Sequence, residues 1–338
     1  MDSKSRVFAV LEGNLPDRVP VFPVVDEYHA PKVLGYAAKD CLVDGMKMAE
    51  SLLAALRLYK YDGIIANLGP GRDPYKQLGC TVDLDSGDVA LFTDNLVKSE
   101  EDLSKVVPPD LFGTGMLAPV QHILDKVGDT HFVVGSVRAP FEISYIQRGS
   151  MAFMSDIYEN PGFVCKMINV AKKITLALGD ALIESGVHAL VVKDSVASAS
   201  MISPEHYSEF AFPLEQEVIS HFRKKVPVIL HICRNSEPLL QKMAKTRASV
   251  LEIDSLVDLA KAKDLVGNKV VIKGNVDSVE VLERGSTEVI RRSVANCMNA
   301  AKAHGNYILS TGDSVPRGCS MDSMKSFVGH GKVLGRYG

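Results

Sequence analysis

The sequence predicts an α/β protein: a (β/α)8 TIM barrel in which residues 1–338 form a single domain with an irregular N-terminal region. Short apolar runs rich in Val and Ile recur along the chain, and segments with helical periodicity lie between most of them. Near-continuous apolar strands that alternate with helices are typical of parallel strands covered on both faces. We count eight such runs, the number of strands that closes a barrel of this kind.

Each expected strand is short and ends in polar or glycine-containing residues. In chain order the strands are RVPVFPVV (18–25), DGIIANL (62–68), HFVVGSV (131–137), HALVVKD (188–194), VPVILHIC (226–233), ASVLEID (248–254), KVVIKGNV (269–276) and NYILSTGD (306–313).

Three intervening segments carry clear helix signals. Residues 160–186 have apolar residues at three- and four-residue steps. Residues 286–305 begin with Ser-Thr, a good helix cap, and end at a glycine. Residues 203–225 open with Ser-Pro, which favours a helix start.

The composition is that of an ordinary globular protein, with 46% hydrophobic and 23% charged residues and a net charge of −3. Charge is not clustered, so neither nucleic acid nor a membrane surface is expected as a partner. No apolar stretch approaches the roughly 18 residues that span a bilayer, and the start of the chain does not resemble a secretory signal. The six cysteines are scattered rather than arranged as a disulfide framework, so we expect a cytoplasmic protein with reduced thiols.

In a barrel, the polar residues that end the strands meet at the C-terminal mouth, where such enzymes keep their active sites. The sequence predicts that these residues gather there: Asp194, His231, Cys233, Glu252, Asp254, Asn275, Asp277 and Asp313.

His231 and Cys233 are two residues apart at the end of a strand, so their side chains are expected on the same face. Cys319 follows the last strand on a loop that can converge on the same point. Two thiolates and an imidazole suit Zn²⁺ and leave the fourth tetrahedral position open, as in catalytic sites. The alternative is that each is a buried, hydrogen-bonded core residue. Cys41, Cys80, Cys165 and Cys297 are interpreted as structural.

The segments LHICRNS (230–236), GNVD (274–277) and STGDSVPRGCS (310–320) resemble the methylcobamide:coenzyme M methyltransferases of the uroporphyrinogen decarboxylase superfamily. Further matches are LEGNLPDRVPVFP (11–23), VGSVRAPFEIS (134–144) and VVKDSVASASMISPEHYSEFAFP (191–213). The family motif, His-x-Cys with a distant third Cys, maps onto His231, Cys233 and Cys319.

The resemblance implies a barrel with zinc at its mouth. It further implies methyl transfer between the cobalt of a corrinoid (methylcobalamin type), presented by a partner corrinoid protein, and a small-molecule heteroatom, usually the sulfur of a thiol. Zinc lowers the pKa of a bound thiol, as it does for water.

Three departures from the family pattern stand out. No arginine lies between Arg18 and Arg57, whereas the decarboxylase branch carries an arginine-containing segment after its first strand. Arg234 stands where the coenzyme M enzymes have a glycine. Cys319 lies several residues further along than the usual cysteine, which directly follows the last strand.

Further polar residues have candidate roles. Asp194 and Glu252 are candidates for catalysis, and Glu252 could also support His231 through a hydrogen bond. Candidate substrate-binding residues are Arg138, Arg234, Asn275, Asp277 and Asp313, where the arginines could hold a sulfonate or carboxylate.

The leading hypothesis is a zinc- and corrinoid-dependent methyltransferase with a thiol acceptor. Three alternatives remain open: demethylation of a methylated ether, amine or thioether, decarboxylation of a tetrapyrrole, and a non-enzymatic barrel whose His/Cys cluster only buffers metal or is a closed structural site.

Overall fold

The computed structural model describes residues 1–66, 82–83, 91–92, 95–111, 113, 115–303 and 305–337. Within these residues one parallel sheet has seven strands in the order β1-β4-β5-β6-β7-β8-β9, and its two edges curl towards each other. The strands are β1 (Gly63–Ala66), β4 (Phe132–Arg138), β5 (Ala189–Lys193), β6 (Val228–Ile232), β7 (Val250–Ile253), β8 (Val271–Val276) and β9 (Tyr307–Thr311). A separate antiparallel pair joins β2 (Val82–Asp83) and β3 (Leu91–Phe92).

These seven strands coincide with seven of the eight predicted runs, which confirms an α/β fold with a parallel sheet. The run 62–68 corresponds to β1, and its last two residues lie outside the described residues.

The predicted first strand, residues 18–25, is not a regular strand. It nevertheless connects the two edges of the sheet: Leu309 N donates to Pro20 O at 2.9 Å, Phe22 N to Leu309 O at 2.8 Å, and Asp62 N to Val21 O at 2.8 Å. Pro20 and Pro23 have no backbone N–H, so a continuous hydrogen-bonded ladder cannot form here.

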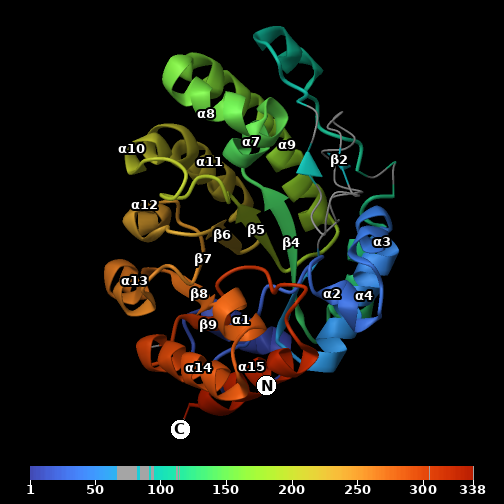
Figure 1. Ribbon diagram of the computed structural model, residues 1–338, viewed down its shortest axis with the longest axis vertical. Coiled ribbons are helices and arrows are strands. Elements are labelled where there is room, and N and C mark those ends of the chain that lie inside the picture. Colours follow the sequence, from blue (N-terminus) through green and yellow to red (C-terminus); the bar gives the residue numbers. More distant parts are fainter. Residues whose placement is uncertain are drawn as a thin grey trace.

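Helices run around the outside of the curved sheet, except for the first one, which lies across the N-terminal ends of the strands (Figure 1). They are α1 (Ser3–Leu11), α2 (Ala30–Val33), α3 (Ala38–Val43), α4 (Gly45–Tyr59), α6 (Ala118–Val127), α7 (Pro140–Arg148), α8 (Ser150–Glu159), α9 (Pro161–Glu184), α10 (Pro204–His206), α11 (Phe212–Phe222), α12 (Leu240–Lys245), α13 (Leu259–Val266), α14 (Thr287–Ala301) and α15 (Met321–Leu334). Short turns of 3₁₀ or π helix are η1 (Glu100–Lys105), η2 (Tyr207–Ala211), η3 (Glu237–Leu239), η4 (Gly267–Lys269) and η5 (Ser278–Glu283). No helix in the described part of the chain is long and apolar enough to cross a membrane.

The predicted helix starts are observed. Ser203 accepts a hydrogen bond from His206 N ahead of Pro204, and Ser286 accepts one from Val289 N at the start of α14. These side chains satisfy backbone N–H groups that have no partner within the helix. The predicted helix 160–186 is α9.

The concave face of the sheet is apolar at one end of the strands and charged at the other. In the lower layer, Val134, Val191, Ile229, Val250 and Val271 share a buried cluster with Val7 and Val10 of α1. Lys193, His231, Glu252 and Lys273 lie two residues further along β5 to β8, and Arg138 lies four residues beyond Val134 in β4. The register pairs Arg138 with Lys193, Lys193 with His231, His231 with Glu252, and Glu252 with Lys273. Because side chains alternate along a strand, this charged row lies directly above the apolar layer.

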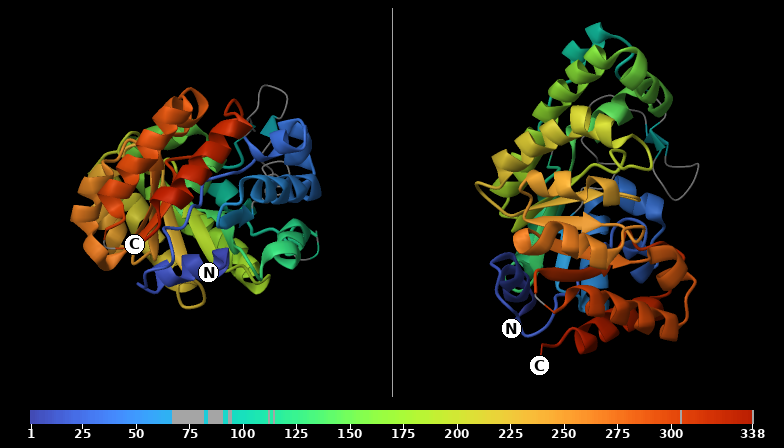
Figure 2. Two further views of the ribbon diagram at one scale, coloured as in Figure 1. Left: turned by 90° about the horizontal axis from the view of Figure 1, so that it is seen from below. Right: turned by 90° about the vertical axis from the view of Figure 1, so that its left-hand side faces the viewer.

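A buried ionic cluster ties α1, the 18–25 segment and β1 together. The Asp62 carboxylate accepts hydrogen bonds from Arg6 Nη1 at 2.7 Å, Arg18 Nη1 at 2.7 Å and Val21 N at 2.7 Å. Asp62 is fully buried, and Arg6 is 6% exposed. Both termini of the chain lie at this end of the molecule (Figure 2).

Asp62→Ala is expected to lower the free energy of unfolding by about 3–5 kcal/mol, because within the described residues it removes the carboxylate partner of Arg18 and one of the two carboxylate partners of Arg6. Urea denaturation followed by far-UV circular dichroism measures the change. The control is Asp129→Ala, at an exposed carboxylate, for which we expect a change within about 0.5 kcal/mol. Equal effects of the two variants would contradict the role given to Asp62.

Candidate active site

The described residues contain one group of possible metal ligands, formed by His231, Cys233 and Asp313. His231 is in β6, Cys233 directly follows that strand, and Asp313 lies two residues after β9. Their donor atoms all lie within 4.8 Å of one another, and His231 Nε2 is 2.9 Å from Cys233 Sγ. The predicted proximity of His231 and Cys233 is therefore observed, with Asp313 beside them.

The other side of the His231 ring faces a buried ion pair. Its Nδ1 lies 2.9 Å from Glu252 Oε1, and the second oxygen of Glu252 is paired with Lys273 Nζ. Lys273 is fully buried, and its Nζ lies 4.7 Å from the centre of the Phe22 ring. A carboxylate at Nδ1 favours the proton on that nitrogen and leaves the Nε2 lone pair directed at Cys233.

Lys273 and Glu252 stabilise each other's charges. Burial raises the pKa of Glu252, but Lys273 and then His231 outweigh it, so the net pKa is well below its ordinary value. Glu252 therefore stays a carboxylate at neutral pH. This is the arrangement in which a metal-binding histidine is oriented by an anionic neighbour.

The three donors fit a zinc ion in kind and in spacing. Imidazole nitrogen, thiolate sulfur and carboxylate oxygen are all accepted by Zn²⁺, and tetrahedral bonds of about 2.0–2.3 Å set neighbouring donor atoms about 3.6 Å apart. Side chains whose donors lie within 4.8 Å of each other reach that spacing by small rotations.

Cys319, the predicted third ligand, is not part of this group. It is buried, and its Sγ contacts Leu282 O at 3.5 Å and Ser320 O at 3.6 Å. Burial raises the pKa of this thiol to about 11, which favours the protonated form over the thiolate that metals bind. In this structure the Cys319 sulfur therefore lies outside the group that His231, Cys233 and Asp313 form.

Arg234 adopts a left-handed conformation with φ of 58°, the backbone region that glycine occupies most readily. Its N–H donates to Asp254 Oδ2 at 2.8 Å, and its side chain is exposed. The backbone therefore retains the bend expected of a glycine, although an arginine stands there.

Asp194 lies apart from the metal-ligand group, on the helix-facing side of the sheet next to Glu215 of α11. It is fully buried, and burial together with the neighbouring Glu215 and Glu142 raises its pKa well above the ordinary value. Tyr207 donates a hydrogen bond to Glu215 at 2.6 Å. Asp194 thus belongs to a buried, proton-holding pair between strand and helix.

Asn275 and Asp277, predicted to bind substrate, hold loops in this structure. Asn275 Nδ2 donates to Asp254 O at 3.1 Å and to Val257 O at 2.7 Å. Asp277 Oδ1 caps η5 by accepting from Val279 N and Glu280 N, both at 2.8 Å. Arg138 is paired with Glu142, whose other oxygen accepts from Ser195 N at 2.8 Å.

A uroporphyrinogen decarboxylase (URO-D) family model matches residues 2–332. The chain belongs to this family. Among curated relatives, it is similar to methylcobamide:CoM methyltransferase MtbA of Methanosarcina mazei, with 27% identity over 209 residues, 60% of this chain and 61% of that protein. It is also similar to a uroporphyrinogen decarboxylase of Prochlorococcus marinus, with 29% identity over 214 residues, 60% of this chain and 59% of that one. The chain therefore matches about three fifths of the length of each.

A solved structure of a methyltransferase from Methanosarcina mazei shares the fold, with a TM-score of 0.83 at 20% identity over 98% of this chain and 99% of that one. Methylcobamide:CoM methyltransferases are thus among the relatives of this family member, which confirms the resemblance seen in its motifs.

Two lysines of the charged row, Lys193 and Lys273, were missed by reasoning from strand ends. Lys193 is half-buried at the end of β5, next to His231 in the register. Burial lowers its pKa, but Asp26, Glu27 and Glu252 outweigh this, so the net pKa is raised. A lysine inside an apolar run, as in VVKD and VVIKGN, is the signal that could have found both.

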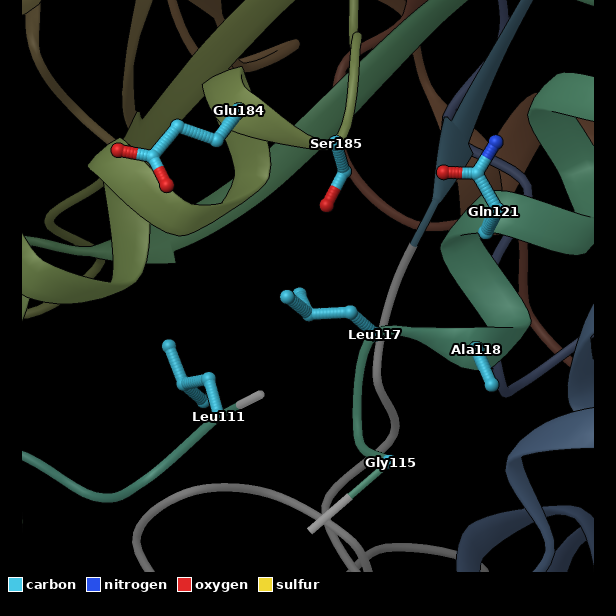
Figure 3. A pocket seen from close by; sticks show the side chains of 7 residues that line it. All are labelled: Leu111, Gly115, Leu117, Ala118, Gln121, Glu184 and Ser185. Atoms are coloured by element: carbon cyan, nitrogen blue, oxygen red, sulfur yellow. The ribbon is translucent and has the colours of Figure 1, made fainter. Parts of the chain in front are cut away.

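A hollow of about 290 Å³ lies elsewhere, between the start of α6 and the end of α9 (Figure 3). Leu111, Leu117 and Gln121 line it on one side, and Glu184 and Ser185 line it on the other. It shares no lining residue with the charged row or the metal-ligand group.

The buried Glu215 is expected to make stability depend on pH. Burial raises its pKa from 4.5 to about 7, so the folded protein keeps a proton that the unfolded chain has lost between these values. The contribution of protonated Glu215 to the free energy of unfolding is therefore fully present below pH 4.5 and is lost as the pH rises through about 7. The difference is about 3 kcal/mol.

Glu215→Gln removes this titration and keeps an acceptor for Tyr207. We expect the free energy of unfolding of wild type, relative to Glu215→Gln, to fall by about 3 kcal/mol between about pH 4.5 and pH 8. Urea denaturation at a series of pH values measures it. Parallel pH profiles for the two proteins would show that Glu215 is not protonated in the folded state.

Proposed function

We propose that this chain is a zinc-dependent methyltransferase that moves a methyl group between a protein-bound corrinoid and a thiol. The observation that carries the proposal is the His231–Cys233 pair at the end of β6, with the Glu252–Lys273 ion pair behind the imidazole. The names of several relatives, which include methylcobamide and coenzyme M, support this chemistry. We further propose that residues 1–338 form one (β/α)8 barrel domain.

His231 and Cys233 supply two metal ligands in this proposal. Zinc bound there lowers the pKa of a coordinated thiol, so that the thiol is nucleophilic at neutral pH. Glu252 keeps the His231 proton on Nδ1, and Lys273 keeps Glu252 ionised. The apolar layer beneath the charged row closes the site from below. The corrinoid therefore has to arrive from above, at the mouth, where a partner protein presents it.

The position of Lys193 supports a thiol substrate that carries a negative charge. It stands beside His231 in the register, and within the described residues its amine makes no hydrogen bond or ion pair. Arg138 follows next in the row. A sulfonate or carboxylate on the substrate fits this positive edge, and coenzyme M (2-mercaptoethanesulfonate) is such a thiol.

Purified protein is expected to hold one zinc per chain and to demethylate methylcobalamin in the presence of coenzyme M. Cys233→Ala removes a metal ligand, so we expect loss of zinc and of turnover. Inductively coupled plasma mass spectrometry and the absorbance change of the corrinoid measure the two quantities. Cys165→Ala, at an exposed cysteine, is the matched control and keeps both.

A zinc-free wild type in zinc-replete medium contradicts the proposal. So does decarboxylation of uroporphyrinogen without methyl transfer, which is the reaction named for other relatives. Methylation of Co(I) corrinoid by a methylated ether, amine or thioether, with no thiol methylation, would assign the opposite direction of transfer.

Lys193→Met is expected to raise KM for coenzyme M by roughly 10- to 100-fold, because a charge-assisted contact is lost. The rate with 2-mercaptoethanol, a neutral thiol, is expected to change little. Steady-state kinetics with both thiols separate the two effects. An equal loss for both thiols would remove Lys193 from substrate recognition.

A further inference from the structure

Backbone hydrogen bonds on either side of Asp313 fix the position of the loop that carries it. Gly312 N donates to Val276 O at 2.8 Å, and Val315 N donates to Val24 O at 2.9 Å. A Cβ on Gly312 would lie 2.4 Å from Ser255 N, so only glycine allows this close approach. The chain therefore turns tightly after β9 and holds Asp313 beside His231 and Cys233.

The Asp313 carboxylate makes few contacts that stabilise the fold. Its Oδ1 accepts a hydrogen bond from the next backbone N–H, Ser314 N, at 2.7 Å. The Ser314 hydroxyl itself is bonded to Asp26. Within the described residues, Asp313 makes no hydrogen bond to a second loop, unlike Asp254 and Asp277, and it is half-buried.

Cys319 is anchored on the far side of the same loop. Its N–H donates to Pro316 O at 3.1 Å, and its carbonyl accepts from Lys32 Nζ at 2.9 Å. Its thiol lies against Leu282 O of η5. These contacts hold Cys319 in a position outside the group that Asp313 forms with His231 and Cys233.

We propose that Asp313 supplies the third protein ligand of the metal, so that the donor set is one imidazole, one thiolate and one carboxylate. This inference rests on the proposed function. One thiolate and one carboxylate neutralise Zn²⁺ as two thiolates do, and a fourth position stays open for substrate. The oxygen donor makes the site harder, so it discriminates less in favour of soft ions such as Cd²⁺ than a site with two thiolates.

Cobalt substitution tests the ligand set without an activity assay, because each thiolate bound to Co²⁺ adds near-ultraviolet charge-transfer absorption. Wild type titrated with Co²⁺ is expected to show the absorption of one thiolate. Cys319→Ser keeps its intensity and affinity, and Cys233→Ser abolishes it. Asp313→Cys raises it about twofold, because a second thiolate binds.

Removing the carboxylate is expected to weaken Co²⁺ binding by about 100-fold or more in Asp313→Ala. Asp313→Asn keeps an acceptor for Ser314 N and removes the charge, and it is expected to weaken binding in the same direction. Circular dichroism and the thermal midpoint check the fold of each variant. Cys165→Ser is the matched control for loss of a thiol away from the site.

Two results overturn the inference and leave the metal site in place: a halved absorption in Cys319→Ser, or unchanged Co²⁺ affinity in both folded Asp313 variants. Either one would identify Cys319 or another residue as the third ligand. A wild type that binds neither Co²⁺ nor Zn²⁺ contradicts the proposed function itself.

Discussion

The buried chain from Lys273 through Glu252 to His231 is the interaction on which the site depends. Separately, each charge would be costly inside the protein, since an unpaired buried ion destabilises the fold by several kcal/mol. They are tolerated because β6, β7 and β8 place them side by side in register, where the Glu252 carboxylate lies within ion-pair distance of both Lys273 and His231. A slip of one residue in any of these strands would turn its member of the chain to the opposite face.

The apolar half of the concave face of the sheet gives that register its stability. Apolar side chains fill the layer below the charged row, and α1 covers them from the N-terminal ends of the strands. Asp62 links α1 to the 18–25 segment through Arg6 and Arg18. That segment also supplies Phe22, whose ring lies beneath the Lys273 amine. Residues 18–25 therefore connect the apolar layer below the site with the charged Lys273 within it.

The strands and the His-x-Cys pair could be predicted from sequence, because apolar runs and local spacing are properties of consecutive residues. The irregularity of 18–25 follows from Pro20 and Pro23, but its bonds to both edge strands depend on tertiary structure. Lys193 and Lys273 could not be assigned from spacing, because each stands within an apolar run and only the register with the neighbouring strands brings it into the charged row. The relative positions of Asp313 and Cys319 depend on the path of a loop, which spacing along the chain does not determine.

Arg234 adopts a left-handed backbone conformation that glycine usually provides. A left-handed conformation costs a non-glycine residue about 1–2 kcal/mol. Asp254 offsets this by accepting the Arg234 N–H at 2.8 Å, and its other oxygen accepts from Leu256 N at 3.0 Å. Asp254 thereby joins the loop after β6 to the loop after β7. The bend that follows Cys233 is thus fixed by a carboxylate from the neighbouring strand, which leaves residue 234 free to present a charged side chain at the rim of the mouth.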